Sequence, residues 1–247
     1  MRPMRPMRWL LVSLTIAGCA QAGKANSIIG GLTDAGAASD GNDFPEPDAP
    51  LIDAPPQQIT LSQTTSSVIT RNHSFACFVD GTGGITYQNS YYRVFAPADH
   101  GITSTLHISE VTFGIESASA GVGTMQPAQV KLGTYAATPA GITLDLTKIS
   151  PLAAASIQIP DGEGTTMTVP IKADLEPTTR LIVELSVDDG RAKSNSFFIG
   201  TNGAGERKPG YTRAADCDLL SPTTMRSIAA QIPTGETDII LTVTGTM

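Results

Sequence analysis

The sequence has few basic residues, few aromatic residues and few charges of any kind. Its 247 residues include 16 Lys and Arg against 23 Asp and Glu, which gives a formal net charge of −7. A nucleic-acid-binding protein needs a basic face to neutralise phosphates, so this balance excludes an electrostatic nucleic-acid partner. Hydrophobic residues make up 40% of the chain and charged residues only 16%, which indicates a packed globular domain rather than a disordered chain.

Familiar catalytic motifs are also missing. The sequence has no Gly-x-Ser-x-Gly elbow for a nucleophilic serine and no His-Glu-x-x-His zinc motif. The histidines, His73, His100 and His107, lack a spacing suited to zinc. His107 stands between two apolar residues of a predicted strand, so we expect its ring to face water. No catalytic residue is predicted from these patterns.

The amino terminus has the layout of an export signal. Three arginines among the first eight residues precede an apolar stretch of nine residues, Trp9 to Ala17. A membrane-spanning helix needs about 20 apolar residues, so residues 1–18 are predicted to be a cleaved leader and not a permanent anchor. The apolar stretch ends in Ile16-Ala17-Gly18-Cys19.

At this point the sequence resembles bacterial lipoprotein precursors, whose lipobox has an aliphatic residue, two small residues and a cysteine. The resemblance implies that Cys19 becomes the acylated first residue of the mature chain and anchors it to a membrane. Ala20 in the next position implies transfer to the outer membrane. An ordinary secretory signal, with Cys19 present by chance, is the alternative.

Residues 19–56 are small, acidic and proline-bearing. Six acidic residues stand against a lone Lys24, and the stretch offers too little apolar surface to offset the entropy of ordering. We expect a disordered tether that connects the anchor to a folded domain at residues 57–247. Asp40-Gly41-Asn42-Asp43 lacks the oxygen spacing of a calcium-binding loop.

The folded part alternates apolar and polar residues with a period of two, which predicts strands. The alternation is strongest in Arg180–Val187 and recurs around Val130 and Leu132, in Met167–Ile171 and in Ile239–Val243. Between Leu106 and Glu116 the apolar residues change parity at Ser109-Glu110, which predicts a β-bulge. Further strands are expected at Ile59–Ser62, Phe75–Val79, Tyr91–Ala96, Ser156–Ile159 and Phe197–Gly200.

Only one segment looks helical. Pro222–Gln231 has Ser221 placed as its N-cap and Pro222 at its first position. Many short strands and one short helix predict an all-β fold, an antiparallel two-sheet sandwich of the jelly-roll type. A parallel α/β fold would need more helices.

Two cysteines remain once Cys19 carries lipid. Outside the cytoplasm, Cys77 and Cys217 are expected to form a disulfide that joins an early strand to the segment before the predicted helix. Two buried free thiols are the alternative.

Most of the predicted domain shows a second resemblance. The runs Phe197–Gly205, Lys208–Tyr211 and Asp216-Cys217, together with Ser90–Phe95 and Val111–Glu116, are similar to β-sandwich modules at the ends of bacterial secreted and surface proteins. Those modules mostly lack an assigned activity. The resemblance therefore implies a fold, but no reaction.

Candidate ligand-binding residues are few. Tyr92 and Tyr211 are candidates because a tyrosine ring can stack on a sugar, and Asn202 is a candidate because it begins a glycine-rich loop on a rigid scaffold. Core or turn positions are the alternative for each. No cofactor is expected except a structural Ca²⁺ at Asp80, Asp188 and Asp189, where ordinary turn hydrogen bonds are the competing explanation.

Three functions stay open at this stage. The first is a lipid-anchored envelope module that binds a glycan, another envelope polymer or a protein. The second is a carboxylate-based hydrolase, for which Glu110 with Glu116 or Glu184 with Asp188 would be the acid pairs, although strand surfaces carry such acids routinely. The third is a passive structural lipoprotein. The missing catalytic motifs favour binding.

Overall fold

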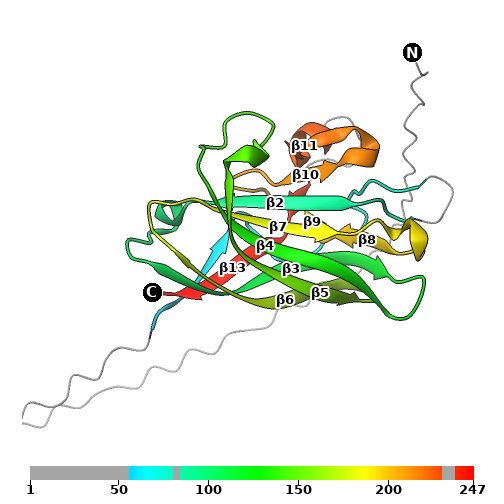
Figure 1. Ribbon diagram of the computed structural model, residues 1–247, viewed down its shortest axis with the longest axis horizontal. Coiled ribbons are helices and arrows are strands. Elements are labelled where there is room, and N and C mark those ends of the chain that lie inside the picture. Colours follow the sequence, from blue (N-terminus) through cyan, green and yellow to red (C-terminus); the bar gives the residue numbers. More distant parts are fainter. Residues whose placement is uncertain (1–55, 80–83, 230–236) are drawn as a thin grey trace, which may run out of the picture. The chain divides into compact units, whose positions relative to one another are not determined.

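The computed structural model describes residues 56–79, 84–229 and 237–247, and Pro56–Met247 forms one compact unit (Figure 1). The predicted leader, Cys19 and the tether up to residue 55 lie outside the described residues. Within the described residues, no helix combines the length and the apolar character needed to cross a membrane.

Two antiparallel sheets build this unit. The smaller sheet has the order β1-β13-β3-β6, and β8 also pairs with β3. Its strands are β1 (Gln58–Ser62), β13 (Leu241–Thr246), β3 (Leu106–Ser119), β6 (Gly162–Leu175) and β8 (Ser196–Ile199). The larger sheet has the order β11-β10-β2-β7-β4-β5. Its strands are β11 (Leu219–Thr224), β10 (Tyr211–Ala214), β2 (Asn89–Phe95), β7 (Leu181–Val187), β4 (Met125–Tyr135) and β5 (Ile149–Pro160).

Short elements complete the unit. The strands β9 (Thr201–Asn202) and β12 (Asp238–Ile239) pair with each other. The only α-helix in the described part of the chain is α1 (Met225–Ala229). The 3-10 turns are η1 (Pro97–His100), η2 (Leu146–Lys148), η3 (Gly190–Ala192) and η4 (Ala215–Cys217).

The strand order is that of a jelly roll. If the elements between β7 and β13 are set aside, β1, β13, β3 and β6 form one sheet and β2, β7, β4 and β5 form the other. Eight antiparallel strands shared between two sheets in two Greek keys are the jelly-roll arrangement. The predicted all-β, two-sheet fold is therefore confirmed. Residues 188–240 are an insertion between the last two strands of the roll.

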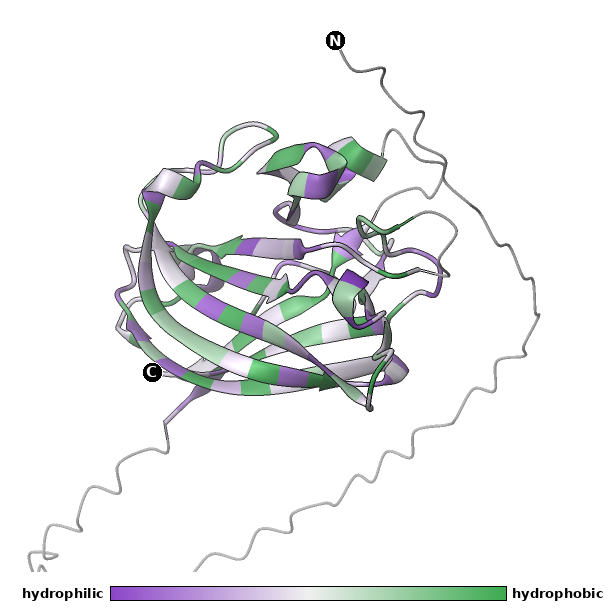
Figure 2. Cartoon of the chain, turned by 45° about the vertical axis from the view of Figure 1, so that its right-hand side comes forward, coloured by the Kyte–Doolittle hydropathy of each residue, from purple (hydrophilic) through white to green (hydrophobic). Residues whose placement is uncertain are grey.

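The hydrophobic core lies between the sheets. The ring of Phe197 lies 6.2 Å from that of Tyr91 on the larger sheet and 6.5 Å from that of Phe113 on the smaller one. Figure 2 shows hydrophobic and hydrophilic residues alternating along the long strands, as the period of two predicts. In β7, however, Ile182 and Ser186 on the opposite face are also buried, so both faces of this strand are covered.

The predicted β-bulge is confirmed. The pairing of β3 with β6 shifts register between Ile108 and Glu110, and β13 shifts opposite the same place. His107 is exposed, as predicted, and its Nδ1 lies 2.8 Å from the carboxylate of Asp174.

The predicted disulfide between Cys77 and Cys217 is present and closes a sequence separation of 140 residues. The predicted strand at Phe75–Val79 is wrong, because this segment makes only one isolated bridge, from Phe78 to Thr86. The side chain of Asn89 bonds both the N–H and the C=O of Cys77, and the Tyr87 N–H donates to the same C=O, so a side chain supplies part of what a strand partner would.

The predicted helix was placed too early in the sequence. Ser221 and Pro222 belong to β11, and α1 begins only at Met225. Strand pairing overrides local helix propensity here, because β11 pairs with β10 at Leu219, Thr223 and Thr224, and its Pro222 carbonyl accepts a backbone hydrogen bond from the Leu144 N–H. The hydroxyl of Thr224, rather than that of Ser221, accepts a hydrogen bond from the Ser227 N–H at the start of the helix. Residues 230 and 231 lie outside the described residues.

Candidate functional site

Part of the outer face of the larger sheet, which points away from the core, is apolar. Strand register aligns Tyr211, Tyr92, Glu184, Lys131 and Ala154 across β10, β2, β7, β4 and β5. These positions alternate with core residues along each strand, so they face outward.

The neighbouring row on this face is entirely apolar and contains Val94, Ile182, Gly133 and Pro151. A solvent-facing row of a sandwich is normally polar. This part of the face must therefore be covered by something else in the chain.

The cover is the connection between β4 and β5, residues 136–148, which we call the strap. β4 and β5 lie at one edge of the larger sheet and β11 lies at the other. The Leu144 N–H donates to the Pro222 carbonyl at 2.9 Å, and the Thr224 N–H donates to the Ile142 carbonyl at 2.7 Å. The strap thus crosses the sheet and pairs with β11; Figure 1 shows it as the green loop above β2.

Leu144 anchors the strap to the sheet. Its side chain is 3% exposed and belongs to a cluster of buried side chains on the outer face. The other members of the cluster are Tyr92, Val94, Tyr135, Ile182 and Tyr211. The hydroxyl of Tyr135 also accepts a hydrogen bond from the Asp145 N–H, which connects the strap to the end of β4.

A groove of about 600 Å³ opens between the strap and the β5 side of the sheet. Its lining is mostly aliphatic. The lining residues are Tyr92, Lys131, Leu132, Gly133, Leu146, Ile149, Pro151, Leu152, Ala153, Ala154, Ile182, Glu184 and Arg213. Leu146 and Leu152 are 37% and 40% exposed, so apolar surface faces solvent on two sides of the groove.

One end of the groove is charged. The Tyr92 hydroxyl donates to Glu184 Oε1 at 3.2 Å, and Lys131 Nζ lies 3.4 Å from Glu184 Oε2. The Arg213 Nε donates to the Leu220 carbonyl, and no carboxylate pairs with its guanidinium among the described residues. Burial raises the pKa of Tyr92 above its ordinary value, so this hydroxyl stays protonated. Two cations, Lys131 on β4 and Arg213 on β10, and one carboxylate therefore line this end.

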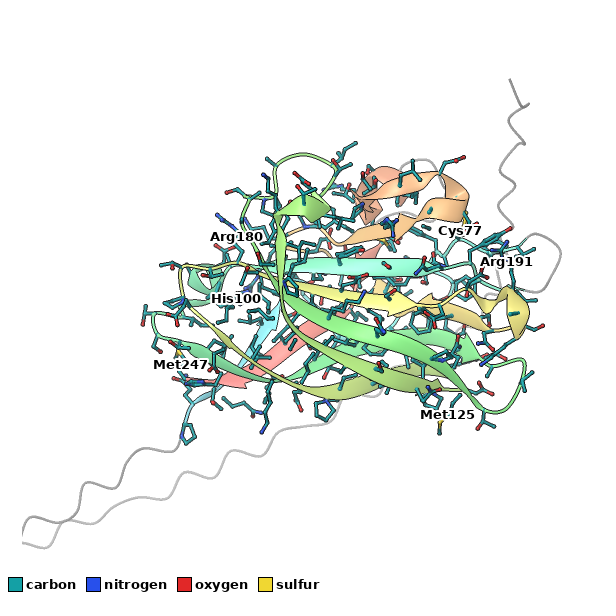
Figure 3. All side chains as sticks on the ribbon, in the orientation of Figure 1. Cys77, His100, Met125, Arg180, Arg191 and Met247 are labelled. Atoms are coloured by element: carbon teal, nitrogen blue, oxygen red, sulfur yellow. A yellow bond between two sulfur atoms is a disulfide. The ribbon has the colours of Figure 1, made fainter. Side chains whose placement is uncertain are left out.

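A smaller pocket of about 160 Å³ lies on the same face, and the strap residues Thr138 and Pro139 form part of its lining. Tyr211 also lines it, and burial raises the pKa of this tyrosine to about 12. Arg180 and Lys208 add positive charge, and Lys208 Nζ lies 3.9 Å from Asp99. In Figure 3, Arg180 lies at the end of the sheet opposite Cys77.

The predicted ligand-binding residues are only partly brought together. Tyr92 and Tyr211 lie opposite each other on neighbouring strands, but they are 2% and 1% exposed and cannot offer a ring face to a sugar. Asn202 lies in the insertion and is 2% exposed. Its side chain donates to the Ser66 carbonyl and accepts from the Ala204 N–H, so it holds a loop together.

Of the predicted calcium ligands, Asp189 makes turn contacts. Asp189 caps η3 through the Arg191 N–H and pairs with the guanidinium of the same residue, and these hydrogen bonds lower its pKa. Asp188 is exposed, and Asp80 lies outside the described residues. In the part of the chain that the structure describes, no group of three His, Cys, Asp or Glu side chains is arranged to hold a metal.

The proposed acid pairs of a hydrolase do not converge. Glu184 and Asp188 are four residues apart, which separates their Cα atoms by about 13 Å along an extended chain, and Glu110 and Glu116 are separated by about 20 Å. Glycosidases need their carboxylates about 5–10 Å apart. Glu116 moreover accepts hydrogen bonds from three backbone N–H groups at residues 72–74.

The sequence did not single out Lys131, Arg213 or the strap. One signal was present: Ile182 occupies an outward position in a strand whose inward positions are already apolar. An apolar residue on both faces indicates that the strand is covered on both sides.

Comparisons with protein-family models, with curated proteins and with solved structures found no match to this chain.

Proposed function

We propose that this chain is an exported, lipid-anchored binding module of the cell envelope, attached to the outer membrane through Cys19, and that the groove is its ligand site. The groove carries the proposal. Its volume of about 600 Å³ falls within the range of ligand sites, and it combines an aliphatic lining with one charged end. The leader and the lipobox-like quartet support the location.

The chemistry of the groove favours an aliphatic ligand that carries one anionic group. Leu146, Pro151 and Leu152 are exposed in the lining and supply apolar contacts, which stabilise binding by about 0.8 kcal/mol for each buried CH₂. Lys131 and Arg213 outnumber Glu184 at the charged end. Acyl chains of envelope lipids and lipid-modified molecules have this chemistry. A glycan ligand would need an exposed aromatic ring or a row of polar groups on the floor of the groove.

Calorimetric titration with dodecanoate tests this assignment, in a chain carrying Cys19→Ser so that the predicted acylation does not interfere. We expect saturable binding that Leu152→Asn and Lys131→Gln each weaken by about fivefold or more, because each removes a contact worth about 1 kcal/mol. Leu220→Asn is the matched control, since Leu220 is 69% exposed on β11 and does not line the groove.

Three results would contradict the assignment. One is the absence of binding, and another is an equal loss of affinity in Leu152→Asn and Leu220→Asn. The third is that a hexasaccharide or a protein binds to the chain whereas dodecanoate does not. That result would favour the glycan or protein ligand that the sequence left open. A passive structural lipoprotein would give no titration with any probe.

The location has its own test. The mass of the chain recovered from the outer membrane should show cleavage after residue 18, acyl groups on Cys19 and a disulfide between the other two cysteines. A full-length precursor in the cytosol would contradict it.

A further inference from the structure

β5 is the last strand of the larger sheet, and its outer edge is unpaired among the described residues. It is 12 residues long, with the sequence ISPLAAASIQIP, and contains no charged residue. Its prolines, Pro151 and Pro160, stand near the two ends. A β-bulge falls at Leu152, which is skipped in the pairing with β4, and the stretch from Ala153 to Ile159 then offers backbone N–H and C=O groups along an uninterrupted edge.

Such an edge is unusual in a native protein. Edge strands are normally short, charged, interrupted by proline or covered, because an open edge pairs with other chains. The edge strands of the smaller sheet follow this rule. β1 has five residues, and β6 carries Glu163, Lys172 and Asp174 as well as Pro170. β5 has none of this protection in its central part.

We infer that β5 is a homodimer edge, which pairs antiparallel with β5 of a second copy about a two-fold axis through Ser156. In this register Ala155 faces Ile157, Ala154 faces Gln158, and Ala153 faces Ile159 of the other copy. Every pair beside the axis joins a small side chain to a larger one. Seven residue pairs would form about seven backbone hydrogen bonds.

The alternatives fit less well. A slip of one residue would place the outer face of one copy opposite the inner face of the other. A two-fold axis through Ala155 would oppose two alanines, and an axis through Ile157 would oppose two isoleucines. The axis through Ser156 places only the two exposed Ser156 side chains opposite each other, so the half-buried row that contains Ala155 and Ile157 has neither the gap nor the crowding. An isologous pair of this kind is the commonest oligomer symmetry.

The burial of the β5 side chains is consistent with pairing to a second copy. Along β5, the outward residues are exposed and the inward residues Ala153, Ala155 and Ile157 are only half-buried at the rim of the core. A second copy would cover these inward side chains. It would also stand beside Leu152 and Ala154, which line the groove, so that two grooves would meet at the axis.

Cysteine cross-linking in the full chain, recovered from the envelope, tests the pair and its register. Ser156→Cys places each new thiol opposite its own copy, where Cβ atoms of facing residues lie about 4.5–5.5 Å apart. Gln129→Cys is the matched control, because Gln129 is exposed beside Ser156 on the same face but one strand further in. The chain without an added cysteine is the second control, because any cross-link that it forms arises through Cys19.

We expect Ser156→Cys to give at least about ten times more cross-linked dimer than Gln129→Cys, because only its thiols face each other within disulfide reach. Ala154→Cys and Gln158→Cys should each give little alone and should cross-link when the two variants are co-expressed. Equal yields from Ser156→Cys and Gln129→Cys would overturn the proposal. So would a strong dimer from Ala154→Cys alone, since it would indicate another register. Dodecanoate is also titrated into the reduced Ser156→Cys variant, so that a failure of the dimer and a failure of the proposed ligand site can be distinguished.

Discussion

Leu144→Ala is the substitution that most sharply tests whether the strap is bound to the sheet. Leu144 is 3% exposed and packs in the cluster that includes Tyr92 and Tyr211, so the substitution removes three carbon atoms from a filled site. Buried Leu→Ala substitutions cost about 2–5 kcal/mol. We expect a value near the lower end, about 2.5 kcal/mol, because the cavity adjoins the open groove and the strap can settle into it.

For a domain of this size, each kcal/mol shifts the Tm by about 2–4 °C, so Leu144→Ala should lower it by about 5–10 °C in scanning calorimetry. Ile142→Ala is the control on the same strap: Ile142 is 60% exposed, and its loss should cost less than about 0.5 kcal/mol. Hydrogen exchange of the Thr224 amide, which donates to the strap, should accelerate in Leu144→Ala alone. Equal Tm shifts in the two variants would refute the packing argument.

Three further predictions concern stability. Replacing both Cys77 and Cys217 by serine should lower the free energy of unfolding by about 3–5 kcal/mol in urea titrations, because the bond closes a separation of 140 residues. The folded state keeps Tyr211 protonated up to about pH 12, whereas the unfolded chain releases this proton near pH 10. Stability should therefore fall as the pH rises from about 10 to about 12, and Tyr211→Phe should reduce that slope in urea titrations at fixed pH. Gly200→Ala should cost about 1–3 kcal/mol, because its Cβ would lie 2.6 Å from the backbone of β3, while Gly162→Ala, with no atom closer than 3.5 Å, should be nearly neutral in the same assay.

Local patterns in the sequence were sufficient for much of the fold. The alternation in Arg180–Val187 identifies β7, and the change of parity at Ser109-Glu110 identifies the bulge in β3, because both are properties of neighbouring residues. Where a distant partner decides the conformation, local reasoning failed. Leu219–Thr224 pairs as a strand despite helix-like caps, and the backbone at Cys77 is engaged by a side chain from β2.

The candidate site could not be found in the same way. The groove depends on strand register, which brings Tyr92, Lys131 and Glu184 together from three separate strands. No sequence pattern records that alignment. The strap is equally hidden, because its anchor Leu144 is a single leucine in a connection without periodicity, and only the pairing with β11 shows that it crosses the sheet.

Methyl NMR of the chain during titration with dodecanoate tests the ligand site most directly. The account predicts that the methyl signals of Leu146, Leu152 and Ile182 shift together and saturate, while those of Leu220 do not move. Shifts confined to Leu220 or to the core, or no shift at any methyl group, would contradict it.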